Sequence, residues 1–254
     1  VPAPPEAAGP GTRGRFTGGY RKAAEPVQPI SATPGYPVAL RLVAPAALPR
    51  RRLSTVAGRI ALLHAVAHIE FNAINLAWDA VHRFRGLPQA FYRDWAGVAA
   101  DETRHYQMLR DRLAALGAAY GDLPAHNGLW QMAVDTADDL VARMALVPRL
   151  LEARGLDVTP GMIERLSAAG DTPSAAALRV ILEEEVAHVA VGTRWFHFAC
   201  EARQLDPEAT FEKLLGACRA GQLRGPFNHP ARRAAGFSER ELAFIEAEAA
   251  RARR

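Results

Sequence analysis

The sequence predicts an all-α protein, a bundle of four long helices with an extended N-terminal arm and extra C-terminal helices. Apolar residues recur at helical spacing through most of residues 53–204, and Gly or Pro residues end the runs where turns are needed. No stretch alternates apolar and polar residues as a half-buried strand would. With 254 residues, 49% of them hydrophobic and 23% charged, the chain is long and apolar enough to bury a large core.

Composition divides the chain into three parts. Residues 1–52 are rich in Pro, Ala and Arg and lack sustained periodicity, so we expect an extended arm there. Residues 53–204 carry the bundle, and residues 205–254 form a C-terminal helical extension whose last helix starts at the capping-box pattern Ser238-x-x-Glu241. The long helices are expected over residues 54–84, 89–116, 126–154 and 172–203, with a short helical piece between Pro160 and Gly170.

The net charge of +4 is unevenly distributed along the chain. Residues 1–52 carry +6 and residues 222–254 carry +3, which leaves −5 on residues 53–221. This acidic middle disfavours a nucleic-acid partner. No run of about 18 apolar residues is present, so we expect no membrane span. Two cysteines without a disulfide-type spacing suit a reducing compartment, and we expect a cytoplasmic protein.

Ionisable side chains occur on the apolar faces of three of the expected helices. A lone ionised carboxylate on such a face costs several kcal/mol unless it is neutralised or paired. Carboxylates on three separate core faces therefore indicate a shared cation. The side chains concerned are Glu70 in the first helix, Glu102 and His105 in the second, and Glu185 and His188 in the fourth.

The spacing of these residues indicates the kind of cation. Residues 102–105 and 185–188 both read Glu-x-x-His, which places two ligands on one helical face. Two such motifs, with one Glu from each of two further helices, make up the ligand set of di-iron and di-manganese carboxylate bundles. Glu70 is the first of these two further ligands, and the second should come from the third helix.

Glu152 is the preferred ligand of the third helix. The interval from Glu70 to Glu102 is 32 residues and that from Glu152 to Glu185 is 33, as expected of two hairpins that present ligands at one level. Pro148 should kink the helix just before Glu152, however, and Gly155 lies close behind it. Asp138 is the alternative ligand.

At this point the sequence resembles a known group of proteins. Asp101-Glu102-Thr103-Arg104-His105 is similar to the Asp-Glu-x-Arg-His signature of non-haem di-iron carboxylate oxidases and oxygenases. The second motif departs from it, because Ala187 stands where the signature has arginine. Over about Leu53–Gln204 the chain resembles an uncharacterised ferritin-like family of unknown function and, more distantly, bacterial tRNA-modifying di-iron hydroxylases. The resemblance implies a ferritin-like four-helix bundle.

The resemblance also implies the composition of the site. It implies two iron ions, or a manganese–iron pair, with O₂ as co-substrate. Asp101 and Glu184 are expected to lie outside the ligands and to accept the free ring N–H of a ligand histidine. The metal ligands that it implies are Glu70, Glu102, His105, Glu152, Glu185 and His188.

The leading hypothesis is an O₂-activating oxidase or oxygenase with a small-molecule substrate and an electron donor; a homodimer is compatible with it. Two further hypotheses remain open: a ferroxidase, storage or peroxide-scavenging protein of ferritin type, and a non-enzymatic helical module with a structural dimetal site. The alternative to any metal is a buried salt-bridge network in which Arg59, Arg104 and Arg179 neutralise the acids.

Overall fold

The computed structural model describes residues 30–48, 52–217, 223 and 225–251. Over these residues it confirms the all-α prediction: the elements are helices, and a single isolated bridge pairs Leu42 with Ala125. The start of the expected N-terminal arm lies outside the described residues, and residues 30–48 contain one 3₁₀ turn, η1 (Pro45–Ala47).

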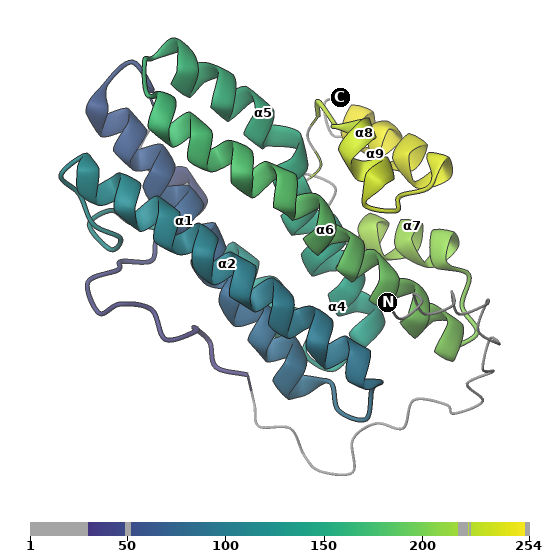
Figure 1. Cartoon of the computed structure of the whole chain (residues 1–254). Helices are drawn as coiled ribbons and strands as arrows, with labels where there is room; N and C mark the ends of the chain where they lie inside the picture. The colour runs from purple at the N-terminus through teal and green to yellow at the C-terminus, as the bar shows by residue number, and fades with distance from the viewer. Residues whose placement is uncertain (1–29, 49–51, 218–222, 224, 252–254) are drawn as a thin grey trace, which may run out of the picture.

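Two helical hairpins lie side by side and form the bundle (Figure 1). One hairpin pairs α1 with α2 and the other pairs α5 with α6, while α2 and α6 contact each other across the middle. The α4 helix also packs on α6, and α7 and α9 pack together beside it. The helices are α1 (Val56–Arg83), α2 (Gln89–Ala115), α3 (Gly128–Asp135), α4 (Leu140–Leu146), the π-helix η2 (Val147–Glu152), α5 (Ala153–Ala168), α6 (Thr172–Ala202), α7 (Pro207–Ala217), α8 (His229–Ala234) and α9 (Glu239–Arg251).

The hydrophobic core consists of two clusters stacked along the bundle. The first cluster contains Leu76 of α1, Ala99 of α2 and Val189 of α6, together with side chains of α4, η2, α7 and α9. The second contains residues of α5 together with residues of α1, α2 and α6 that come earlier in α1 and α6 and later in α2 than those of the first cluster. The ionisable residues that stood out in the sequence fall between the two stretches on each of these three helices. A polar layer therefore divides the core.

The third predicted helix is wrong in its continuity and in its end, although its start lies within two residues of α3. It is interrupted at residues 136–139, where the side chain of Asp139 caps α4 by accepting from the backbone N–H groups of Val141 and Ala142. It also does not end at Gly155, because α5 continues through that glycine and through Pro160 to Ala168. Burial of the apolar face of α5 against α6 outweighs these two local helix-breaking signals.

The described part of the C-terminal extension contains α7, which starts at Pro207, and the predicted capping box, which is confirmed. The Ser238 N–H donates to Glu241 Oε2 at 3.0 Å, and the Glu241 N–H donates to Ser238 Oγ at 3.2 Å.

Helix α1 is long and apolar enough to cross a membrane by length and composition alone. In the bundle, 67% of its most apolar window is buried, as in the core helix of a folded domain. The buried residues of this helix include Glu70.

Helix α6 packs closely against η2 at a glycine. A Cβ added to Gly192 would lie 2.4 Å from Cβ of Pro148, a distance that carbon atoms do not adopt without displacement. We therefore expect Gly192→Ala to lower the free energy of unfolding by about 1–3 kcal/mol through overpacking, as measured by urea denaturation.

The matched control is Gly97→Ala. Gly97 is exposed within α2 and has no atom within 4 Å of its added Cβ. Because alanine is the better helix former, this variant should be as stable as the wild type or more stable by up to about 1 kcal/mol. Equal stability of both variants would contradict the close packing of α6 on η2.

Candidate metal centre

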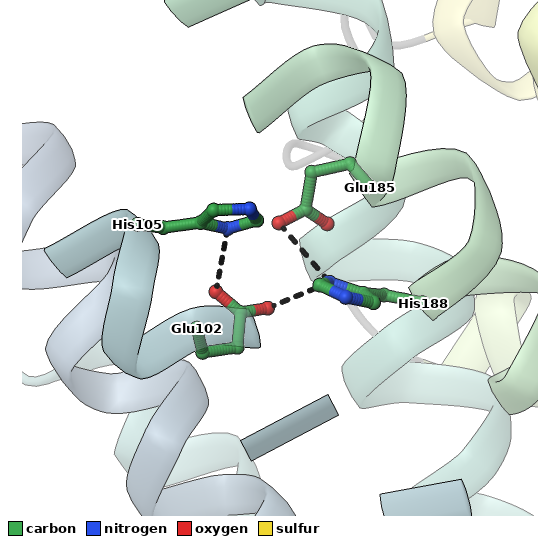
Figure 2. Close-up of side chains that lie close together, drawn as sticks. All are labelled: Glu102, His105, Glu185 and His188. Carbon is green, nitrogen blue, oxygen red and sulfur yellow. Dashed lines mark ion pairs between the residues drawn. The ribbon is translucent and has the colours of Figure 1, made fainter. Parts of the chain in front are cut away.

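Four side chains from two helices converge in the polar layer (Figure 2). The Glu-x-x-His motif of α2 supplies Glu102 and His105, and that of α6 supplies Glu185 and His188. Each contributes one nitrogen or oxygen atom, and these atoms all lie within 4.8 Å of one another. Since residues three apart share a helical face, each motif presents both of its side chains to the facing helix.

Glu102 lies between the two histidines. Its Oε1 is 3.0 Å from Nδ1 of His188, and its Oε2 is 3.4 Å from Nδ1 of His105 (Figure 2). Glu185 approaches the same His188 ring, and its Oε1 lies 3.6 Å from Nδ1. The two imidazole nitrogens and the two oxygens of one carboxylate thus mark two adjacent positions, and Glu102 faces both.

Glu70 flanks the cluster on the α1 side. It is buried, and its Oε2 lies 3.2 Å from Nδ1 of His105. Burial, together with the charge of Glu102, raises the pKa of Glu70 to about 8. Helix α1 therefore adds a third carboxylate to the site.

Glu152 flanks the cluster at the end of η2. Burial, followed by the charges of Glu102 and Glu185, raises the pKa of Glu152 well above its ordinary value. Asp138, the alternative ligand of the third helix, is exposed in the turn between α3 and α4. The structure therefore brings Glu152, rather than Asp138, towards the other carboxylates.

Two atoms at the centre of the cluster lack hydrogen bonds within the described residues. They are Oε2 of Glu102 and Nδ1 of His188, both fully buried. An unpaired buried polar atom costs about 1–3 kcal/mol, and carboxylates that face one another add repulsion. A cation at this position would satisfy both atoms and offset the repulsion, so the residues present fit a bound metal.

The histidines are basic in the absence of a cation. Burial lowers the pKa of His105, but the close approach of the Glu102 and Glu70 carboxylates outweighs this effect and raises it to about 10. The same balance, with Glu102 and Glu185, raises the pKa of His188 to about 11. Protons on the rings thus replace the cation, and a metal would have to displace them.

The arginines proposed for a salt-bridge network do not pair with the buried carboxylates of the cluster. Arg59 lies 3.5 Å from Asp171, and Arg179 donates to Ser167. Arg104 pairs with Asp101 and Glu184, both of them partly exposed. These contacts leave the central carboxylates to the histidines and favour the metal interpretation.

The acid that precedes each motif binds the histidine of the other motif. Glu184 Oε2 accepts from His105 Nε2 at 2.7 Å, and Asp101 Oδ2 accepts from His188 Nε2 at 3.3 Å. Both Nδ1 atoms are therefore left facing the central carboxylates. Such outer carboxylates orient ligand histidines and fix their tautomer.

Arg104 connects the two outer acids. It donates to Asp101 at 2.8 Å and to Glu184 at 2.7 Å. The hydrogen bonding of Arg104 to Glu184 is the largest cause of the lowered pKa of Glu184. One arginine thus serves both motifs, which explains why alanine at position 187 is sufficient. The sequence carried the signal in its Asp-Glu-x-Arg-His motif, but the pairing across the bundle was not anticipated.

We expect Glu184→Gln to weaken metal binding by about 10–100-fold, because the amide is a poorer acceptor for the His105 ring and leaves Arg104 with one acid. Mn²⁺ titration of the metal-free protein, followed by the electron paramagnetic resonance of free Mn²⁺, measures the change. Glu183→Gln is the matched control, since Glu183 is exposed on the same helix and should bind like the wild type. Equal affinities of the two variants would exclude the orienting role.

Comparisons with known proteins give a family and a relative. The family model with the description "Protein of unknown function (DUF455)" matches residues 12–243. An "Uncharacterized protein" of Haemophilus influenzae is 44% identical over 227 residues, which cover 87% of this chain and 78% of the relative. No solved structure matches the chain.

Proposed function

Because the chain belongs to the DUF455 family, whose description states no function, we propose from its own side chains that it is a non-haem dimetal carboxylate protein. The metal pair is two iron ions or manganese and iron, and the proposed activity is the O₂-dependent oxidation of a substrate. The observation that carries the proposal is the buried Glu102, whose two oxygens face one histidine each and whose Oε2 has no hydrogen bond within the described chain.

The donor atoms suit two adjacent cations. Glu70, Glu102 Oε2 and His105 Nδ1 would hold the first, which we name the α1–α2 position. Glu102 Oε1, Glu185 and His188 Nδ1 would hold the second, the α6 position, with Glu152 beside it. Oxygen-rich donor sets with imidazole favour iron and manganese over metals that select thiolates.

Bound iron would supply the electrons that reduce O₂ and the oxidising power for the substrate. The protein contributes position and environment. Glu184 and Asp101 hold the ring N–H groups of His105 and His188, so both Nδ1 atoms face Glu102, where they would hold the cations. The core clusters on either side of the polar layer exclude water and strengthen the electrostatic interactions within it.

The substrate class, the electron donor and the place of action complete the proposal. The acidic charge of residues 53–221 favours a small molecule over a nucleic acid as substrate. An oxidase cycle requires an electron donor, which we propose to be a separate protein or a soluble reductant. We propose that the protein acts in the cytoplasm.

Metal content and O₂ uptake test the proposed function. Protein from iron-replete cells should hold close to two iron or manganese ions per chain, and the reduced protein should consume O₂. Glu102→Gln should lose most of the metal and lower O₂ uptake more than tenfold, since it alters the donor shared by both positions. Glu183→Gln should leave both quantities unchanged.

Three outcomes separate the hypotheses. Less than stoichiometric iron and manganese in the wild type would contradict a dimetal protein. Catalytic Fe(II) oxidation that needs no organic substrate would favour a ferroxidase or storage role. Stoichiometric metal that raises the melting temperature but does not react with O₂ would favour a structural site.

A further inference from the structure

Arg149 is a buried cation in the middle of η2. Its side chain has no exposed surface, and a charge in such a place is tolerated only when it is paired. Its Nη2 donates to Glu241 Oε2 of α9 at 2.8 Å, and its Nε donates to Thr193 of α6 at 3.2 Å. Arg149 thus joins η2 to the C-terminal extension.

Three aromatic rings surround the same guanidinium. Its carbon lies 4.8 Å from the ring centre of Phe196, 4.4 Å from that of Phe211 and 4.5 Å from that of Phe237. These rings belong to α6, to α7 and to the segment between α8 and α9. A cation above aromatic faces is attracted by each of them, most strongly when water is excluded. We name this arrangement of Arg149, Glu241 and the three rings the η2 anchor.

The η2 segment needs such an anchor because its own backbone is irregular. Pro148 lacks the N–H that a helix interior uses, and π-helical turns are rare and occur mostly at functional sites. Pro148 of η2 also lies so close to Gly192 of α6 that an added Cβ would not fit between them. Contacts with neighbouring elements therefore decide the path of η2.

Glu152 is the last residue of η2, three positions after Arg149. The charges of Glu102 in α2 and Glu185 in α6 act on its carboxyl group and, in the absence of a cation, repel it. A segment without a fixed position would move this carboxylate away from them. The η2 anchor fixes Arg149 three residues earlier in the same segment and so opposes such a movement.

We propose that Arg149 is a positioning residue, which through Glu241 and the three phenylalanines makes the C-terminal helices α7–α9 hold Glu152 at the α6 metal position. This inference rests on the proposed function, since it needs a dimetal centre. It also implies that only the α6 position depends on the C-terminal helices. Glu70, Glu102 and His105 come from the α1–α2 hairpin, which has no part in the η2 anchor.

The experiment is an Mn²⁺ titration of the metal-free full chain, read by the electron paramagnetic resonance of free Mn²⁺, with the melting temperature measured in parallel. The wild type should bind two Mn²⁺ per chain. Arg149→Lys keeps the charge but loses the planar fork and the stacking of the guanidinium. It should keep one Mn²⁺ near wild-type affinity and bind the second at least tenfold more weakly. Glu152→Gln should show the same pattern.

Arg232→Lys is the matched control. Arg232 is equally buried, pairs with Asp157 of α5 at 2.7 Å and lies over the rings of Phe227 and Phe237. It also donates to the carbonyl of Ala153, the residue after Glu152, through a long 3.4 Å bond on a regular helix. Arg232→Lys keeps a charge near Phe237 and leaves Arg149, its pair with Glu241, and the rings of Phe196 and Phe211 in place. It should therefore lower the melting temperature as Arg149→Lys does, yet bind both Mn²⁺ ions like the wild type.

A second variant covers the case in which Arg149→Lys does not fold. Arg149→Met combined with Glu241→Gln removes both charges together and leaves neither buried alone. It should also bind one Mn²⁺ tightly and the second weakly. Two Mn²⁺ with wild-type affinity in either folded Arg149 variant, or equal weakening in Arg232→Lys, would overturn the positioning role while leaving the dimetal site intact. A wild type that binds neither Mn²⁺ nor iron would overturn the proposed function itself.

Discussion

The structure depends on the placement of ionisable groups inside an apolar bundle. Glu102 and His105 are almost completely buried, at 1% and 0% exposure, between two hydrophobic clusters. Carboxylates in such a place are costly unless a counter-charge is shared among them. Proton-bearing histidines supply that charge without a metal, and a pair of cations would supply it with one. The interior is therefore arranged around a charge balance.

The same interactions determine how the two hairpins meet. His105 of α2 is held by Glu184 of α6, and His188 of α6 is held by Asp101 of α2. Arg104 joins the two acids on the outer side. Because the contact between hairpins passes through the site, whatever binds there also stabilises the bundle, and metal affinity and folding stability become coupled.

The regular α-helix is lost in η2, the segment that carries Glu152. A continuous α-helix through Pro148 would lose a backbone hydrogen bond, and the chain adopts π-helical turns there instead. The C-terminal helices supply the contacts that this irregular segment cannot supply for itself, through the buried pair of Arg149 and Glu241. Local irregularity at a site and support from a separate element are expected to occur together.

The sequence alone determined the helical class, the bounds of α1, α2 and α6 to within two residues, and the inward faces of the Glu-x-x-His motifs. These follow from helical periodicity, which is a local property of neighbouring residues. Only the tertiary structure decided the break at residues 136–139 and the continuation of α5 through Gly155 and Pro160. It also decided that the acid before each motif binds the histidine of the other motif, and that Arg149 is buried. Each of these is decided by contacts between residues far apart in the chain, where burial outweighs local preference, so no pattern of neighbours could show them.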